Sequence, residues 1–174
     1  MADTKTVQES EATKTIERVV VDTSNLADFV GGPIFPPERF YNQTPVGVVM
    51  GLAWTATGGS ILYIETNAIE EVEGRGDLIL TGQLGDVMKE SAQIAHAVAK
   101  SVLLEIDPDN HYFANTKLHL HVPTGATPKD GPSAGCTMIT SFLSLAMRKL
   151  VKEDLAITGE VTLRGKILSI GGVR

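Results

Sequence analysis

The alternation of apolar and polar positions predicts regular elements along the chain from about residue 46 onward. "VGVVMGLAWT" at 46–55 is an apolar run rich in β-branched residues, and a glycine-containing turn leads from it into "SILYIETNAI" at 60–69. Two such runs joined by a short turn predict a β-hairpin. "LILTG" at 78–82 predicts a third strand, and we expect the charged residues 70–77 to form a surface loop before it.

Two later stretches have the composition and spacing of helices. The segment 86–106 predicts an amphipathic helix, because polar residues face away from a stripe that recurs every three or four positions. That stripe consists of Val87, Met88, Ser91, Ile94, Ala95, Val98 and Val102. "CTMITSFLSLAM" at 136–147 is apolar on nearly every side, which predicts a buried helix.

The other regular segments have the patterns of strands. "TKLHLHV" at 116–122 alternates strictly, so leucine and valine occupy one face and a lysine and two histidines the other. "LAITGEVTLRGKILSI" at 155–170 predicts two or three short strands with a turn at Arg164 and Gly165. Together the elements indicate an α+β or α/β chain with a mixed sheet.

The first 47 residues lack this regularity. Residues 1–16 are polar, and we expect them to form a disordered, solvated tail. "ERVVVDTSNLADFV" at 17–30 predicts a short strand followed by a helix that is capped near Thr23 or Ser24. Four prolines and three glycines interrupt residues 31–47, so we expect a boundary near residues 41–46.

Composition narrows the class of protein. A length of 174 residues suits one domain with a short attached segment, and 43% hydrophobic residues suffice for a packed core. The net charge of −6 without basic clusters argues against a dedicated nucleic-acid binder. Cys136 is the only cysteine, which excludes an internal disulfide and a cysteine-based zinc cluster. We see neither a secretory signal nor an apolar run of the roughly 18 residues that span a membrane.

The stretch "TPKDGPSAGCTM" at 127–138 carries the candidate chemistry. Gly131, Ser133 and Gly135 fit the pattern G-x-S-x-G, which presents a nucleophile on a sharp turn between a strand and a helix. Backbone N–H groups and the positive end of the helix dipole at such a turn can hold a developing oxyanion. The alternative is structural, because serine is also among the best helix caps.

A catalytic serine needs a base, and the sequence leaves its identity open. All four histidines precede Ser133, which excludes the serine–acid–histidine order of α/β-hydrolases. His119 or His121 remains formally possible as a base, although paired histidines on the polar face of a strand more often support the fold. A desolvated lysine is the other option. The candidates are Lys129, Lys149, Lys152 and Lys166, none of which stands in an obviously apolar setting.

Cofactor motifs are not visible. "GATPKDG" does not fit the phosphate-binding pattern G-x-x-x-x-G-K-[ST], and no other segment does. Two strand histidines without a third ligand at a recognisable spacing predict no metal site.

The stretch "GATPKDGPSAG" at 125–135 resembles the active-site signature of the Lon protease family. The resemblance extends over about residues 44–174. It includes "TPVGVVMGLAWTATGGSILYIET", "LTGQLGDVMKESAQIA", "LHLHVPTGATPKDGPSAG" and "AITGEVTLRGKILSIGGV". It implies an α+β fold with mixed sheets and packed helices, as in the Lon proteolytic domain. "FVGGPIFPPERFY" at 29–41 resembles the end of the family's ATPase module, so we expect residues 17–43 to be the ATPase lid and linker.

The resemblance also implies roles for individual residues. Ser133 is the expected nucleophile of a Ser–Lys dyad. The family's lysine base lies about 43 residues after it, at roughly position 176. This sequence ends at Arg174, so we expect a fragment truncated at its C-terminus, with little activity by itself. Thr158 resembles the threonine beside the dyad, and Asp130 resembles an aspartate that engages the lysine in closed forms.

Other matching positions imply less. We expect Thr158 and Asp130 to be supporting residues, with an ordinary strand threonine and a turn or cap aspartate as the alternatives. Trp54 lies on a strand near the expected cleft, although we expect a core residue there. His119 and His121 match a strand in which we expect them to support the fold. The role of Glu65 is open.

For the whole protein the resemblance implies an ATP-dependent serine endopeptidase that degrades misfolded or regulatory proteins as a homohexamer. ATP and magnesium are expected for the ATPase module and no cofactor for this chain. The sequence of residues 40–60 most resembles the organellar branch of the family, so we expect the protein in the mitochondrial matrix, with a bacterial cytoplasm as the alternative. DNA binding occurs in the family but is not indicated here, nor is membrane association. The alternatives are a non-catalytic Lon-like assembly or regulatory module and, less well supported, a hydrolase of another family.

Overall fold

A computed structural model gives the fold of residues 18–32, 40–55 and 58–171. The chain divides into two compact units, residues 1–38 and residues 39–174. In chain order the elements are α1 (Leu26–Val30), β1 (Val48–Thr55), β2 (Gly58–Glu71), β3 (Asp77–Thr81), α2 (Asp86–Ile106), α3 (Tyr112–Asn115), β4 (Thr116–His121), α4 (Gly135–Met147), β5 (Ala156–Ile157), β6 (Glu160–Val161) and β7 (Ile167–Leu168).

The first unit contains α1, preceded by a turn instead of the strand that we predicted. Asp22 Oδ1 accepts hydrogen bonds from the N–H and the hydroxyl of Ser24, and Asn25 Nδ2 donates to the carbonyl of Val20. Asn25 is the N-cap residue of α1, although its side chain does not cap the helix. The strand prediction for the valine run was wrong because β-branched residues form a strand only beside another strand, and none of the described residues pairs with them. The cap prediction at Thr23 or Ser24 missed by one residue.

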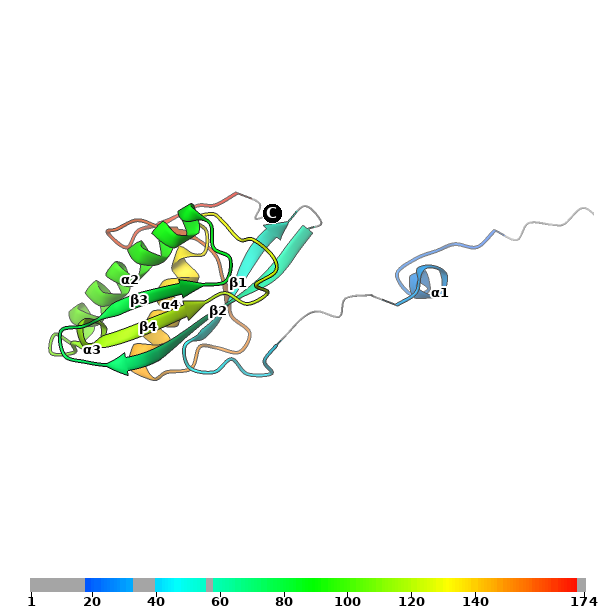
Figure 1. Cartoon of the computed structure of the whole chain (residues 1–174). Coiled ribbons are helices and arrows are strands. Elements are labelled where there is room, and N and C mark those ends of the chain that lie inside the picture. Colours follow the sequence, from blue (N-terminus) through cyan, green and yellow to red (C-terminus); the bar gives the residue numbers. More distant parts are fainter. Residues whose placement is uncertain (1–17, 33–39, 56–57, 172–174) are drawn as a thin grey trace, which may run out of the picture. The chain divides into compact units, whose positions relative to one another are not determined.

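The second unit is built on a five-stranded mixed sheet with the order β3-β4-β2-β1-β5 (Figure 1). β1 and β2 form the predicted antiparallel hairpin, and β2 also pairs with β4 in antiparallel orientation. β3–β4 and β1–β5 are parallel pairs. The predicted α+β class with a mixed sheet is confirmed. β6 and β7 form a separate two-stranded ribbon, so the prediction of two or three short strands in 155–170 is also confirmed.

Two details of the sheet differ from the prediction. β2 continues to Glu71, so two residues that we assigned to a loop belong to the strand. Its register against β4 shifts between Ala68 and Glu70, where a bulge leaves Ile69 half exposed. α3 was not predicted, because four residues are too few to show a helical period, but it places Phe113 in the core.

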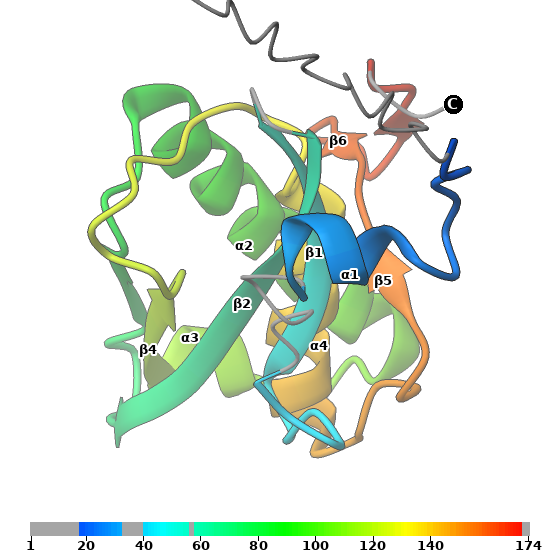
Figure 2. The same cartoon turned by 90° about the vertical axis from the view of Figure 1, so that its right-hand side faces the viewer.

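The core lies between one face of the sheet and the helices α2 and α4 (Figures 1 and 2). Ile64, Leu118 and Leu120 point from the sheet toward Met138 and Phe142 of α4, and all five side chains are fully buried. α2 has the predicted bounds, but the face that it buries differs in part from the predicted stripe, since Val87 is exposed. The residues of α2 in this core are Met88, Ala92, Ala95, Ala99 and Leu103. Small side chains allow the two helices to approach each other closely.

The buried face of α4 also carries three hydroxyl side chains, which we call the hydroxyl stripe: Thr137, Ser141 and Ser144. Thr137 Oγ1 donates to the carbonyl of Ile157, at 2.7 Å. Ser141 Oγ donates its only proton to the carbonyl of Gly47, at 2.7 Å, so its 2.6 Å contact with Thr66 is a bond that Thr66 donates. Every hydroxyl of this stripe therefore has a defined partner outside the helix or at its end.

Ser144 completes the hydroxyl stripe at the C-terminal end of α4. Its Oγ accepts a hydrogen bond from the N–H of Gly47, at 3.0 Å, and donates to the carbonyl of Lys149. Both main-chain polar groups of Gly47 thus bind α4 serines. Gly47 has φ = 81°, and a Cβ atom there would lie 2.4 Å from the carbonyl oxygen of Thr66, so only glycine fits at this position.

The residues just before β1 cover part of the opposite face of the sheet. The ring of Phe40 stacks on that of Tyr63, with centroids 4.9 Å apart, and Tyr41 meets Tyr63 edge-on. The hydroxyl of Tyr41 donates to Glu65 Oε1 at 2.7 Å, a bond that raises the pKa of Tyr41. This contact gives Glu65 a structural role. The domain boundary between residues 43 and 44 stays a prediction.

Candidate active site

A cleft of about 780 Å³ lies between the β1–β2 hairpin and the segments around α4 and β6. It is lined by Leu52, Ala53, Trp54, Gly59, Ser60, Ile61, Pro132, Ser133, Thr158, Glu160, Ser169, Ile170 and Gly171. The lining is mostly apolar, with hydroxyl groups and a single carboxylate among the described residues. Such a composition suits an extended chain with apolar side chains.

Ser133 lies in the turn just before α4, between a strand and a helix, as the G-x-S-x-G pattern predicted. α4 begins at Gly135 with Ala134 as its N-cap residue, and no side chain caps it. The structural alternative, in which the Ser133 hydroxyl caps the helix, is therefore not what the fold shows. Instead, Ser133 is half-buried and borders the cleft.

The main chain around Ser133 is fixed by the segment between β5 and β6. The N–H of Gly159 donates to the carbonyl of Ser133 at 2.7 Å, and the N–H of Cys136 donates to the carbonyl of Gly159 at 3.0 Å. On the other side, Ser91 Oγ of α2 donates to the carbonyl of Pro132, at 3.2 Å. These three bonds fix the main chain around Ser133 from two sides, the segment between β5 and β6 and the helix α2.

Two N–H groups at this turn can serve an oxyanion. Within the described part of the chain, the N–H groups of Ser133 and Ala134 donate to no acceptor, and the Ser133 hydroxyl has no partner. The next two N–H groups, of Gly135 and Cys136, are occupied. The positive end of the α4 dipole thus presents two uncommitted donors beside the serine, at the edge of the cleft.

Thr158 lies next to the main chain of Ser133. Its hydroxyl donates to the main-chain carbonyl of Ser133 at 3.3 Å, and its side chain lines the cleft. The glycine that follows approaches its neighbours closely, since a Cβ atom on Gly159 would lie 2.8 Å from Ile167 Cγ2. This tight packing brings Thr158 against the turn that carries Ser133.

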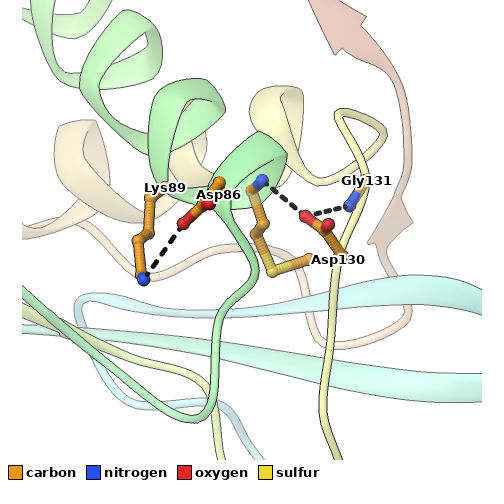
Figure 3. Close-up of polar contacts among 5 residues, drawn as sticks. Asp86, Lys89, Asp130 and Gly131 are labelled. Atoms are coloured by element: carbon orange, nitrogen blue, oxygen red, sulfur yellow. Dashed lines mark hydrogen bonds and ion pairs between the residues drawn. The ribbon is translucent and has the colours of Figure 1, made fainter.

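Asp130 binds the N-terminus of α2 (Figure 3). Its Oδ1 accepts hydrogen bonds from the N–H groups of Met88 and Gly131, each at 2.9 Å. These bonds lower the pKa of Asp130, with the Met88 bond as the largest cause. Gly85, the N-cap residue of α2, has no side chain to supply this cap, and a Cβ atom there would lie 2.2 Å from Asp130 Cγ. Asp130 therefore caps a helix distant in sequence.

None of the bases considered from the sequence lines the cleft. The ammonium group of Lys129 donates to three main-chain carbonyls, and Lys149, Lys152 and Lys166 are exposed. His119 Nε2 and His121 Nδ1 each lie 2.8 Å from the hydroxyl of Thr81 on the neighbouring strand. The expectation that these histidines support the sheet is consistent with this bonding.

Trp54 is 73% exposed and lines the cleft, so the expectation of a core residue was wrong. Sequence reasoning also overlooked Glu160, which is the only ionisable side chain among the described lining residues. A signal was available for Glu160. In the extended segment that ends in β6, residues 158 and 160 lie on the same side, while Val161 is buried against α4.

The described residues contain neither a candidate metal site nor a candidate membrane span. Over residues 18–32, 40–55 and 58–171, no group of three or more His, Cys, Asp or Glu side chains could hold a metal ion. No helix in those ranges is long and apolar enough to cross a membrane.

Fold and cleft together define an α+β domain with a serine at the edge of a mostly apolar cleft. The family is shown by a match over residues 20–174 to the model described as Lon protease (S16) C-terminal proteolytic domain. The chain belongs to this family, and the resemblance noted in the sequence is confirmed.

Curated relatives agree with this assignment. The "Lon protease homolog, mitochondrial" of Zea mays is 75% identical over 163 residues, which cover 94% of this chain and 17% of the relative. "Lon protease homolog 3, mitochondrial" of Arabidopsis thaliana is 69% identical over 172 residues, covering 99% of this chain and 19% of the relative. The Homo sapiens "Lon protease homolog, mitochondrial" is 56% identical over 164 residues, which cover 91% of this chain and 17% of the relative. The chain thus spans less than a fifth of the length of these relatives.

Proposed function

We propose that this chain is the proteolytic part of an ATP-dependent serine endopeptidase in which Ser133 is the nucleophile. Ser133 Oγ attacks the peptide carbonyl, and an acyl-enzyme forms when the amine departs with a proton. Water then hydrolyses the acyl-enzyme and regenerates the serine. The single observation that carries the proposal is the position of Ser133 at the cleft, beside the uncommitted N–H groups of Ser133 and Ala134.

The base in this proposal is a lysine from the sequence that follows "GGVR" in the family, at roughly position 176. Thr158 and Asp130 are proposed as supporting residues. Thr158 fixes the main chain of the nucleophile, and Asp130 fixes the preceding loop to α2. General-base assistance contributes about 10²- to 10⁴-fold to such a reaction, so the assay requires the full-length protein.

The geometry of β1 supports a peptide as substrate. One edge of β1 pairs with β2 along its whole length, whereas the other edge pairs, among the residues that the structure describes, with β5 only at Met50 and Gly51. Beyond this point, Leu52 and Trp54 line the cleft. An extended peptide can therefore bind along this edge of β1 through main-chain hydrogen bonds and reach Ser133.

For the whole protein we propose degradation of misfolded or regulatory proteins in mitochondria, as the printed names of the relatives suggest. ATP and magnesium bind the ATPase module, of which residues 17–43 form the lid and linker. Six copies form the ring that encloses the cleavage sites. The relatives' names favour the mitochondrion over a bacterial cytoplasm.

A fluorophosphonate probe tests the nucleophile in the full-length protein. We expect labelling and casein digestion in the wild type, and the loss of both in Ser133→Ala. Ser101→Ala is the matched control, because Ser101 is exposed on α2 and bonds only the preceding turn of its own helix. Equal labelling of Ser133→Ala and the wild type would overturn the assignment. A wild type that neither labels nor cleaves would favour the non-catalytic alternative.

A further inference from the structure

The ammonium group of Lys129 is fully occupied by hydrogen bonds to the main chain. Its Nζ donates to the carbonyls of Gly82, Thr124 and Thr127, each at 2.9 Å. An ammonium group has three protons, and all three are used here. The acceptors belong to two separate loops, one that joins β3 to α2 and one that joins β4 to α4.

The main chain of Lys129 joins the same two loops. Its N–H donates to the carbonyl of Gln83 at 3.0 Å, and its carbonyl accepts from the N–H of Gly85 at 2.7 Å. These two main-chain bonds form an isolated parallel β-bridge between Leu84 and Lys129. Three of the five hydrogen bonds of Lys129, to Gly82, Gln83 and Gly85, therefore connect the loop before Ser133 to the start of α2. The other two, to Thr124 and Thr127, close the β4–α4 loop on itself.

The joined loops hold two residues in an uncommon backbone conformation. Gln83 has φ = 58° and Thr124 has φ = 61°, both in the left-handed region. A residue other than glycine in this region is strained and persists only where surrounding contacts impose it. Both residues lie beside acceptors of Lys129: Gln83 follows Gly82, and Thr124 itself supplies a carbonyl. The bonds of Lys129 are among the contacts that hold both residues, together with the bond from the N–H of Thr127 to the carbonyl of Thr124.

The residues after Lys129 are anchored one after another up to the serine. Asp130 binds the N-terminus of α2, Pro132 accepts a bond from Ser91, and Ser133 accepts one from Gly159. Between these anchors, Gly131 has φ = 116° and a Cβ atom there would meet no neighbour, so this turn depends on backbone freedom. The loop that Lys129 holds is therefore joined to the serine by the single turn at Gly131.

We propose that Lys129 is a positioning residue, whose ammonium group holds the loop of residues 124–130 on the β3–α2 loop and thereby sets Ser133 against the cleft. This inference rests on the proposed function of Ser133. The bonds need three donors, so the charged lysine is the active form. Burial lowers the pKa of Lys129, and the three carbonyls counteract proton loss.

The test uses full-length protein and compares Lys129→Met with Lys129→Ala. Lys100→Met is the matched control, because Lys100 is exposed on α2. Since small displacements of a nucleophile cost up to about 10²-fold, we expect Lys129→Met to lower kcat and the rate of fluorophosphonate labelling roughly 10- to 100-fold. KM should change less than about twofold, because the substrate-binding edge of β1 is untouched.

Lys129→Ala allows chemical rescue. n-Propylammonium supplies the three methylene or methyl carbons and the ammonium group that this variant lacks, whereas n-propanol supplies no charge. We expect the amine, and not the alcohol, to restore labelling several-fold. Wild-type labelling by Lys129→Met, or equal effects of the two additives, would overturn the proposal. So would a variant that loses activity only in proportion to its unfolded fraction and that the amine does not rescue.

Failure of the proposed function gives a different result. If Ser133 is not the nucleophile, probe labelling of the wild type is either absent or equal to that of Ser133→Ala, and the loop is then followed by amide hydrogen exchange. We expect faster exchange of the Gly85 and Lys129 N–H groups in Lys129→Met than in the wild type, since both bonds belong to the bridge. Unchanged exchange at both sites would exclude the positioning role in either case.

Discussion

The hydroxyl of Thr158 binds the main-chain carbonyl of Ser133, at 3.3 Å, and not the hydroxyl of that serine. Gly159 donates to the same carbonyl at 2.7 Å, so the acceptor has two partners from consecutive residues. Thr158 therefore acts on the orientation of the turn that carries the nucleophile.

Replacement of Thr158 by valine removes the hydroxyl and keeps the shape. A hydrogen bond contributes about 0.5–1.5 kcal/mol, so we expect kcat of the full-length protein to fall roughly two- to tenfold. Thr158→Ser should stay near the wild-type value in the same steady-state peptide assay. A fall in Thr158→Ser alone would show that the methyl packing and not the hydroxyl is responsible, and an equal fall in both variants would show that the hydroxyl is not sufficient.

The cap that Asp130 provides to α2 predicts a particular dependence on pH. Hydrogen bonds hold the pKa of Asp130 below its ordinary value of 3.8, so the carboxylate stabilises the fold above about pH 3.8. This stabilisation is lost as the pH falls through the lower pKa of the folded state. We expect urea denaturation of Asp130→Ala to show a smaller loss of stability over this acidic range than the wild type.

Gly85→Ala gives an independent check of the same cap. The new Cβ atom would lie 2.2 Å from Asp130 Cγ and displace the carboxylate. The double variant with Asp130→Ala should then be less destabilised than the sum of the two single changes. Strict additivity would show that the two positions are not coupled.

Glu160 predicts a charge preference in the cleft. Its carboxylate is the only ionisable group among the described lining residues, and we expect it to favour peptides with a basic side chain near the scissile bond. Glu160→Gln should reduce kcat/KM for a lysine-containing peptide about two- to tenfold relative to its neutral glutamine analogue. The ratio of the two kcat/KM values is the measurement, and an unchanged ratio would exclude this role.

His96 predicts a loss of stability at mildly acidic pH. Its ring packs edge-on to Phe113 and Phe142, its Nε2 has no hydrogen-bond partner among the described residues, and burial lowers its pKa. The unfolded state therefore binds a proton more readily, and stability falls as the pH decreases below about 6.5 until the lower folded pKa is reached. We expect His96→Leu to flatten the urea-denaturation profile in this window. His111→Gln, at an exposed position, is the control and should keep the wild-type slope.

Local patterning predicted the elements whose faces are defined by packing on the core. The bounds of α2 agree with its apolar spacing, and the β1–β2 hairpin agrees with two apolar runs around a glycine turn. The valine run before α1 shows the limit of this reasoning, because a strand needs a partner that sequence spacing cannot supply. Trp54 shows another limit, because a large aromatic side chain beside a cleft has the same local pattern as one in the core.

The candidate site was predictable at Ser133 and less so around it. The glycines and the proline of "GPSAG" predict a turn before a helix, and this turn is present. The partners that fix it come from distant segments, such as Gly159 and Ser91, so no spacing could reveal them. Lys129 was considered as a base because it is close in sequence, yet its three carbonyl partners depend on how two loops meet.

The hydroxyl stripe of α4 limits the ways in which this helix can move. Apolar contacts tolerate sliding by a fraction of a turn, whereas Thr137, Ser141 and Ser144 each bind one particular main-chain group. Rotation or axial translation of α4 would break these bonds together and leave several buried polar groups without partners. These bonds therefore fix both the rotation of α4 about its axis and its position along the sheet. The turn at the N-terminus of α4, which carries Ser133, is fixed with it.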